Sequence, residues 1–382
     1  MPEGHILVSP PFQKVFYNQR FFPLAGKIFF WTVVNMKLLV LFFLSAITYL
    51  DLLSAPRNFA GTYLTADDPQ IPFEFHIQGE YKSQEMGAQV ISLDKGGLQV
   101  VVYPGGLPGA GWDGKNKSLL HGKLSGKEVK LTPATGERKY LAGPAGQFSA
   151  TRQFPPVGHK LYSGNITGKK LTLLEGGQTK TLKKIFRKSP TLHKKPPQNA
   201  IVLFDGTDKK EFQGGRLDDQ TKLLNTDGKD IRTVRKFSNY NLHLEFMLPF
   251  RPASRGQGRG NSGLYQIDMY ENQILDSFGL EGLHNECGGI YSIKDSKVNA
   301  CLPPLSWQTY DVDFTNAVAK KGKKIKNARL TARLNGILIH DNFEIPNKTG
   351  GSRPDAEGTA GPIKLQGHGN PLQFRNIWIL EK

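Results

Sequence analysis

Cysteine is scarce in this chain of 382 residues, which contains only Cys287 and Cys301. Two thiols on either side of one loop do not make a zinc site, because zinc needs more ligands at tighter spacing. In an exported protein such a pair is typical of a disulfide, so a disulfide between Cys287 and Cys301 is predicted. Two buried free thiols are the alternative.

The sequence also lacks the 3.6-residue periodicity of a long amphipathic helix. It is rich instead in glycine, with 42 residues, and in proline, with 24. This composition favours many short strands joined by turns. Hydrophobic residues make up 38% of the chain and aromatic residues 10%, which is enough for well-packed cores. Together with the length, these features predict an all-β protein with two domains.

Acidic residues are few, with 33 Asp and Glu against 50 Lys and Arg and a formal net charge of +17. Such a charge suits an acidic partner, such as a nucleic acid, an anionic membrane surface or an acidic polysaccharide. The lysines gather in residues 180–195 and 320–326, which read as linker or loop and not as a DNA-reading helix. A solvated basic surface is therefore the first interpretation and an anionic glycan the second. We do not expect a nucleic-acid partner.

One long apolar run stands near the start of the chain. Met36-Lys37 begins it with a positive charge, residues 38–50 are almost wholly apolar, and Leu53-Ser54-Ala55 offers small residues for cleavage. This pattern is typical of a secretory signal peptide, so we expect a secreted or periplasmic protein whose true start is Met36. An uncleaved membrane anchor over residues 28–50 is the alternative.

The pattern of strands and turns predicts four segments. Residues 1–55 hold an N-terminal extension and the signal peptide, 56–188 a small all-β domain, 189–199 a linker rich in proline and lysine, and 200–382 a second β domain. In the first domain, residues 122–131 and 164–173 repeat a strand–turn–strand pattern. The glycine-rich loop 103–114 lacks the spacing and the following helix of a phosphate site. It is predicted to be a structural loop whose Trp112 stacks on a sugar ring or covers a barrel end.

Apolar and polar residues alternate more regularly in residues 200–382. Residues 240–248 are predicted to bury every second side chain from Tyr240 onward, with His243 and Glu245 on a polar face. Asn335-Gly336 is the strongest short hairpin signal. Many antiparallel strands with half-polar faces predict a two-sheet sandwich of the jelly-roll kind. In the last strand the predicted buried residues are Leu372, Phe374, Trp378 and Leu380.

Residues 258–277 are the stretch around which the second domain is organised. A glycine-rich turn opens it, and aromatic and β-branched residues typical of a strand follow. It is predicted to run as a single strand, in which alternation places Tyr265, Met269, Glu271 and Gln273 on one face. A tyrosine, a carboxylate and a carboxamide together suit a sugar hydroxyl or carbonyl better than a core. An edge strand with a solvated polar face is the alternative.

The motif Asn261-Ser262-Gly263, followed by Tyr-Glu-x-Gln-Ile-Leu-Asp-Ser over residues 270–277, resembles the 3-keto-disaccharide hydrolase domain family. The resemblance covers nearly all of residues 200–382 and ends in a long match over 365–378. The N-terminal half resembles a companion β domain that precedes this one in secreted bacterial proteins. The resemblance implies a concanavalin-like sandwich that cleaves glycosides with a ketone at carbon 3 of the sugar. A glycan-binding sandwich without catalysis is the alternative.

The implied chemistry needs one base, because a 3-ketone acidifies the hydrogen on carbon 2. The enolate is then held by hydrogen-bond donors or a divalent metal ion, the leaving group departs from carbon 1, and water adds. The resemblance implies Glu271 as base or metal ligand and His368 as the second catalytic group. The family often has Asp at the position of Gly367. The implied substrate-binding residues are Arg259, Asn261, Tyr265, Gln273, Asp276, Trp307, Gln366 and Arg375.

Some of these residues also have a purely structural interpretation. Asp276 suits the cap of a turn, and Asn261 suits a lock on the glycine-rich bend. Trp307 opens an alternating strand, where a tryptophan usually packs in the core. His368 follows a glycine in a turn, which also suits a surface loop.

Overall fold

Strands make up nearly all of the regular structure in residues 59–382, the part of the chain that the computed structural model describes. The helical elements of this part are one short helix, α2 (Glu74–Ile77), and one 3-10 turn, η1 (Gly256–Gly258). The all-β class predicted from the sequence is confirmed. Within residues 59–382 no helix is long and apolar enough to cross a membrane. The predicted signal peptide and its anchor alternative lie outside the described residues.

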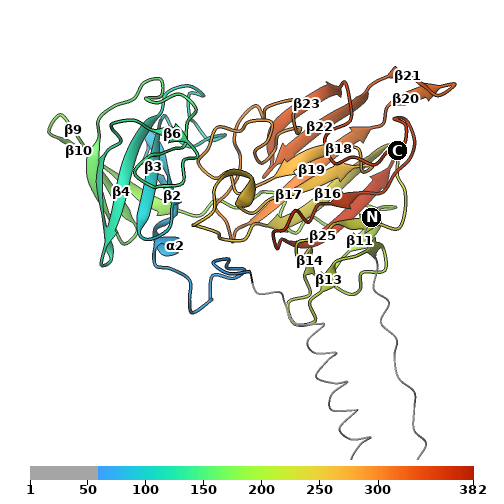
Figure 1. Cartoon of the computed structure of the whole chain (residues 1–382), viewed down its shortest axis with the longest axis horizontal. Coiled ribbons are helices and arrows are strands. Elements are labelled where there is room, and N and C mark those ends of the chain that lie inside the picture. The colour runs from blue at the N-terminus through green and yellow to red at the C-terminus, as the bar shows by residue number, and fades with distance from the viewer. Residues whose placement is uncertain (1–58) are drawn as a thin grey trace, which may run out of the picture. The chain divides into compact units, whose positions relative to one another are not determined.

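Eight strands of the N-terminal half form a closed antiparallel barrel, whose strands are the blue-to-green arrows of Figure 1. Around the barrel their order is β1-β10-β9-β8-β5-β4-β3-β2. Fully buried aliphatic side chains such as Val90, Val100 and Leu120 fill the interior. The barrel strands are β1 (Gly79–Lys82), β2 (Met86–Ser92), β3 (Gly97–Pro104), β4 (Ser118–Ser125), β5 (Glu128–Pro133), β8 (Ser163–Thr167), β9 (Lys170–Glu175) and β10 (Gln178–Ile185). The remaining pair in this half is β6 (Lys139–Tyr140) and β7 (Phe148–Ser149).

The repeated pattern of residues 122–131 and 164–173 corresponds to two hairpins of the barrel. The β4–β5 hairpin turns at Gly126 with φ 59°, and the β8–β9 hairpin turns at Gly168 with φ 57°. Glycine adopts this left-handed conformation without steric cost. Strand β5 also pairs with β8, so the two copies lie side by side.

Two antiparallel sheets form the C-terminal half (Figure 1). The larger has eight strands in the order β13-β14-β25-β16-β19-β22-β23, with β11 also paired to β25. Its strands are β11 (Ile201–Phe204), β13 (Arg216–Leu217), β14 (Leu224–Asn225), β16 (Tyr240–Met247), β19 (Trp307–Thr315), β22 (Ala328–Leu334), β23 (Ile337–Ile345) and β25 (Gln373–Glu381). The smaller sheet has five strands in the order β12-β15-β24-β17-β18. They are β12 (Phe212–Gln213), β15 (Ile231–Thr233), β17 (Ser262–Gln266), β18 (Tyr270–Ile274) and β24 (Lys364–Leu365), and a separate pair, β20 (Val318–Lys320) and β21 (Lys323–Lys326), stands apart.

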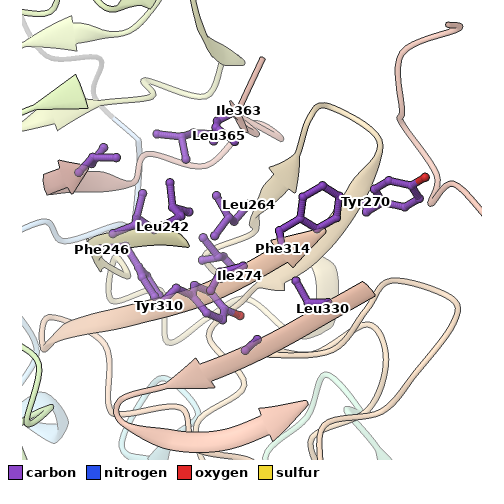
Figure 2. Packing of buried hydrophobic residues seen from close by; sticks show 14 of the residues in the cluster. Leu242, Phe246, Leu264, Tyr270, Ile274, Tyr310, Phe314, Leu330, Ile363 and Leu365 are labelled. Carbon is purple, nitrogen blue, oxygen red and sulfur yellow. The ribbon is translucent and has the colours of Figure 1, made fainter. Parts of the chain in front are cut away.

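The core of this half contains side chains from both sheets, as Figure 2 shows. Leu242 and Phe246 of β16 belong to the same buried cluster as Leu264 of β17 and Ile274 of β18. Apolar residues alternate toward the core on both sheets, so each sheet covers the apolar face of the other. The two-sheet sandwich predicted from the sequence is therefore confirmed.

The turn between β22 and β23 and the strand β25 test the strand predictions for the large sheet. Asn335 and Gly336 form the tight turn between β22 and β23 with φ 53° and 78°, as predicted. In β25, Leu372, Phe374 and Trp378 are buried as predicted, whereas Leu380 is only half-buried. Asn376 adopts φ 45°, and the pairing with β16 shifts register there. This bulge moves Trp378 to the outer face and brings Ile377 and Ile379 into the core.

The segment predicted to be a linker packs on the outer face of the large sheet. The hydroxyl group of Thr191 donates to Asp311 at 2.7 Å, and the backbone N–H of His193 donates to Glu245 at 2.5 Å. The indole N–H of Trp378 donates to the carbonyl of Lys194 at 3.1 Å. Glu245, predicted on a polar face, is thereby completely buried.

The barrel and the sandwich pack within one unit, residues 58–382. Ile91 and Val101 of the barrel share a buried cluster with Phe148 and with Phe278 and Leu280, which follow β18. The Arg255 guanidinium also donates to the carbonyl of Leu93 at 2.8 Å. The loop after β18 is therefore fixed against the barrel.

Candidate active site

The central stretch of the sequence forms a hairpin and not the single strand that was predicted. Strand β17 ends at Gln266, Ile267 and Asp268 adopt φ 47° and 54°, and β18 begins at Tyr270. The reversal pairs Tyr265 directly with Glu271 and Gly263 with Gln273. Tyr265, Glu271 and Gln273 still share a face, whereas Met269 in the turn is fully buried in the core.

A pocket of about 300 Å³ opens over this face of the hairpin. Glu271 and His368, the two predicted catalytic residues, both line it. Among residues 59–382, no lysine or arginine lines the pocket. The predicted binding residues that line it are Asn261, Tyr265, Gln273 and Gln366.

Glu271 is the buried carboxyl group of the pocket, with 3% of its surface exposed. Its Oε2 atom accepts a hydrogen bond from the Tyr265 hydroxyl at 2.8 Å. Burial raises the pKa of Glu271 to about 7, because the hydrogen bond from Tyr265 and the charge of Lys364 only partly offset the loss of water. A carboxyl group with this pKa accepts a proton readily near neutral pH.

Tyr265 holds Glu271 in place and is itself held by contacts with Lys364 and Gln366. The Lys364 ammonium lies 3.6 Å from the centre of the Tyr265 ring and pairs with Asp268 at 2.7 Å. The side-chain N–H of Gln366 donates to the Tyr265 hydroxyl oxygen at 3.2 Å. Burial and the neighbouring Glu271 raise the pKa of Tyr265 well above its usual value, so the hydroxyl stays protonated and remains a donor.

Carboxamide groups dominate the remaining lining. Gln273 donates to the Oε1 atom of Gln257 at 3.1 Å, and Asn261 donates to the backbone carbonyl of Gln257 at 3.0 Å. One side-chain oxygen on Asn261 and one on Gln366 have no donor among the described residues. Oxygen atoms of this kind accept hydrogen bonds from hydroxyl groups, so the pocket suits a neutral polyhydroxylated ligand.

Gln257 and Tyr291 also line the pocket and were not predicted from the sequence. Gln257 lies in the 3-10 turn η1, and Tyr291 lies in the loop after β18. The hydrogen bond from the Tyr291 backbone N–H to the carbonyl of Glu271, at 3.2 Å, fixes that loop beside the pocket. Neither residue belongs to an alternating strand, so strand periodicity gives no signal for them.

His368 reaches the pocket from the turn before β25 and is exposed. Its backbone adopts φ 36°, a left-handed conformation that is uncommon for a side chain other than glycine. At the preceding Gly367, an added Cβ atom would lie 2.1 Å from the backbone carbon of Lys229. The local backbone therefore accepts only glycine at 367, and a carboxylate side chain at this position has no room in this chain.

Four predicted binding residues lie outside the pocket lining. Arg259 pairs with Asp276 at 2.6 Å, and the guanidinium also donates to the carbonyl of Ser92 in the barrel at 3.1 Å. The Arg375 guanidinium stacks 3.9 Å from the ring centre of Trp307 and pairs with Glu245. Each of the four therefore satisfies its polar or aromatic group within the protein, which assigns it a structural role.

Cys287 and Cys301 are both buried free thiols, so the predicted disulfide is wrong. The Cys301 thiol donates to the carbonyl oxygen of Leu302 at 3.4 Å, and both side chains belong to the apolar core of the sandwich. Burial raises the pKa of Cys301 well above its usual value. The pair thus behaves as small core side chains.

The predicted chemistry names a divalent metal ion as one of two ways to hold the enolate. In residues 59–382 no three His, Cys, Asp or Glu side chains lie together so as to hold a metal ion. Glu271 and His368 are the two metal-type ligands that line the pocket. Because this pair is short of a full ligand set, no step proposed below involves a metal ion.

Solved structures similar to this chain include three proteins from Parabacteroides distasonis ATCC 8503, each described as a "putative glycosyl hydrolase". The first is 31% identical, covers 49% of this chain and 85% of its own, and has a TM-score of 0.45. The second is 19% identical with a TM-score of 0.36, covering 48% and 94%. The third is 20% identical with a TM-score of 0.35, covering 48% and 99%. No curated protein sequence matches the chain.

The family model that matches the chain describes a 3-keto-alpha-glucoside-1,2-lyase-like domain and covers residues 199–380. The match begins at the first strand of the large sheet, β11, and extends into the last, β25. It contains the β17–β18 hairpin, the turn of His368 and every residue that lines the pocket. Through this domain the chain belongs to the 3-keto-alpha-glucoside-1,2-lyase-like family.

Proposed function

We propose that the protein is an exported enzyme that cleaves glycosides whose sugar carries a ketone at carbon 3. Its domain family supports an enzyme acting on glycosides. The observation that carries the finer proposal is Glu271, a buried carboxyl group with a pKa of about 7 in a pocket lined by carboxamides. One such group suffices for this reaction, whereas ordinary glycosidases need two carboxylates on either side of the bond.

Catalysis starts when ionised Glu271 removes the proton on carbon 2, next to the ketone. The electron pair of the broken C–H bond forms an enolate, and the negative charge develops on the oxygen of carbon 3. The enolate then collapses and the bond from carbon 1 to the leaving oxygen breaks, so an alcohol departs after taking up a proton. Water adds to carbon 1 of the resulting unsaturated ketone, and the proton returns to carbon 2. The balance is one water consumed for each glycoside cleaved.

Hydrogen-bond donors around the pocket stabilise the enolate. The carboxamide nitrogens of Gln273 and Gln366 each use one proton within the protein and have a second proton to donate. Tyr291, whose hydroxyl group is a further donor, lines the same pocket. Donors aimed at the oxygen where charge develops stabilise a transition state more than the ground state. His368, on the exposed rim, is the group that we assign to proton transfer with the leaving oxygen or with water.

Export is part of the proposal and is supported by the apolar run that begins at Met36-Lys37 and ends with Leu53-Ser54-Ala55. An exported enzyme meets glycosides outside the cytoplasm. This agrees with a pocket that suits a neutral sugar and has no cation in its lining.

The test is release of free sugar from a 3-keto-disaccharide, compared between the wild type and Glu271→Gln. The wild type releases sugar and the variant shows a loss of at least roughly a hundredfold, as expected when a general base is removed. Glu344→Gln, which removes an exposed carboxylate on β23, retains wild-type activity. No release by the wild type, with or without added divalent metal ions, contradicts the proposal. Equal binding of an unoxidised disaccharide by the wild type and Glu271→Gln, without any cleavage, would instead favour the glycan-binding alternative.

A further inference from the structure

A second pocket, of about 290 Å³, lies beside the loop that displays Trp112. The barrel contributes Trp112, Lys117, Thr151 and Arg152, and the loop after β18 contributes Glu281 and Asp295. None of these residues lines the pocket of Glu271. The chemistry proposed above does not use this second pocket.

Lys117 is the unusual group in this pocket. Only 8% of the residue is exposed, yet its ammonium group has no hydrogen-bond acceptor and no carboxylate within 4.0 Å in residues 59–382. The ammonium group lies over the faces of two aromatic rings, 5.0 Å from the ring centre of Trp112 and 5.9 Å from that of Tyr103. Burial accordingly lowers the pKa of Lys117. An ammonium group on a largely buried side chain gains from a ligand that supplies a charged acceptor.

The carboxylates near Lys117 already have partners. Glu281 pairs with Arg152 at 2.9 Å, and Asp295 accepts the backbone N–H of His284 at 2.6 Å. Glu286, which does not line the pocket, accepts the backbone N–H of Gly282 at 2.5 Å. Lys117 is therefore a cation without an ion-pair partner from the described residues, and an anionic ligand in this pocket would supply that partner.

We propose that this pocket binds a sugar that carries a carboxylate, such as a uronic acid. The carboxylate pairs with Lys117, since a charge-assisted hydrogen bond is strongest where water is largely excluded. The indole of Trp112 and the side chain of Val157 offer apolar surface to the ring carbons, while Gln153 and Ser296 offer polar groups to its hydroxyls. The barrel and the loop after β18 thus form an acidic-glycan site together, separate from the neutral pocket of Glu271.

The experiment measures binding of D-glucuronate, D-glucose and inorganic phosphate to the protein by calorimetry at low salt. We expect glucuronate to bind, with an affinity that falls as salt is added, and glucose not to bind. Phosphate is expected to bind at least roughly tenfold more weakly than glucuronate, because it lacks the ring that packs on Trp112. Lys117→Met lowers the glucuronate affinity roughly tenfold or more, and Lys117→Arg retains it. Lys127→Met, which removes an exposed lysine from the β4–β5 turn, leaves the affinity unchanged.

Three outcomes overturn the proposal: no glucuronate binding by the wild type, equal binding of glucuronate by Lys117→Met, or equal binding of glucose. Phosphate binding as tight as that of glucuronate also overturns it, because the site would then recognise an anion without a sugar. Glu271→Gln must bind glucuronate like the wild type, and Lys117→Met must cleave a neutral 3-keto-disaccharide like the wild type. These two controls keep the acidic-glycan site and the proposed enzyme activity separately testable.

Discussion

At the scale of single residues, Glu271 shows how the fold sets the chemistry of a side chain. Its carboxyl group is buried under the pocket, with the Tyr265 hydroxyl as its neutral donor and the Lys364 charge behind the Tyr265 ring. The Tyr265 hydroxyl and the Lys364 charge lower the pKa of Glu271 less than burial raises it. The result is a base matched to neutral pH.

The raised pKa of Glu271 has a consequence for stability. In the unfolded chain the carboxyl group ionises near its model value of 4.5, whereas in the fold it stays protonated up to about pH 7. Unfolding therefore releases a proton between these values, and stability falls as the pH rises through this window. Glu271→Gln removes the effect. The variant gains stability over the wild type as the pH rises, up to on the order of 3 kcal/mol above pH ~7.

Urea unfolding of both proteins at about pH 4 and about pH 8 checks this prediction. Glu286, whose pKa burial also raises to about 7, titrates in both proteins and cancels in the comparison. A difference in unfolding free energy that stays the same at both pH values would contradict the raised pKa.

Gly263 is a positioning residue for the same carboxyl group. An added Cβ atom at 263 would lie 2.3 Å from Glu271 Oε1 and 2.9 Å from the Tyr265 ring. Gly263→Ala therefore displaces the base, and we expect the cleavage rate to fall roughly a hundredfold, as small misplacements of a reacting group do. Gly258→Ala is the matched control, because its Cβ atom meets nothing within 4 Å. Equal rates for the two variants would show that the position of Glu271 does not matter.

The fold brings part of the predicted set of site residues together at this scale. Alternation and the family resemblance bring Glu271, Gln273 and His368 into one pocket, as expected. Arg259 and Asp276 were placed with the substrate, but they pair with each other across 17 positions of the chain. Spacing along a strand gives no information on such a pairing, because the partner comes from a turn whose path depends on the tertiary fold.

At the scale of elements, the segment before the sandwich is the clearest departure from expectation. Its prolines and lysines predict a stiff, polar linker, but residues 189–195 cover a polar patch on the large sheet. The patch contains His243, Glu245 and Asp311, and His243 stacks on Trp378 with ring centres 5.3 Å apart. Burial alone would raise the pKa of Glu245, but hydrogen bonds from His243, Asn376 and Arg375 outweigh it and lower the pKa to about 2.

Glu245→Gln tests whether this patch holds the segment in place. The substitution leaves Arg375 and the backbone N–H of His193 without their charged acceptor, and removing one member of a buried ion pair costs about 3–5 kcal/mol. We expect a loss of this size in chemical unfolding at neutral pH. Glu344→Gln, which breaks an exposed pair with Arg329, should change stability by less than about 0.5 kcal/mol. Similar stabilities for the two variants would mean that the segment is not held by Glu245.

Strand patterns predict elements well until a backbone irregularity intervenes. The turn of Asn335-Gly336 follows from its residues alone, because both adopt the left-handed conformation that the hairpin requires. The bulge at Asn376 and the turn at Ile267-Asp268 carry no comparable signal. Each shifts the inward and outward phase of the residues that follow. This explains why Met269 lies in the core and why Trp378, although buried as predicted, lies on the outer face of the sheet.

At the scale of the whole molecule, the barrel and the sandwich support each other through the loop that follows β18. Phe278 and Leu280 of this loop pack with Ile91 and Val101 of the barrel. The Arg259 guanidinium joins Asp276 of the same loop to the carbonyl of Ser92 in the barrel. The loop leaves β18 directly after Glu271 and Gln273, so the barrel helps to fix the strand that carries the base.

This contact predicts that barrel and sandwich unfold together. Calorimetry of the protein should show one cooperative transition for residues 58–382, because a shared apolar cluster couples the stabilities of its two sides. Phe278→Ala removes a side chain that is 2% exposed and should cost about 3–5 kcal/mol, separating the transition into two. Two separate transitions in the wild type would contradict the coupling.

The central claim is that Glu271 removes the proton on carbon 2 of a 3-keto sugar, and hydrogen exchange measures this step directly. A 1,5-anhydro-3-keto sugar has no leaving group on carbon 1, so in heavy water the enzyme can only exchange its carbon 2 hydrogen for deuterium. By NMR, the wild type is predicted to exchange this hydrogen with a rate that rises through pH ~7, and Glu271→Gln to show only the uncatalysed rate. Exchange by Glu271→Gln at the wild-type rate, or none by the wild type, would contradict the claim.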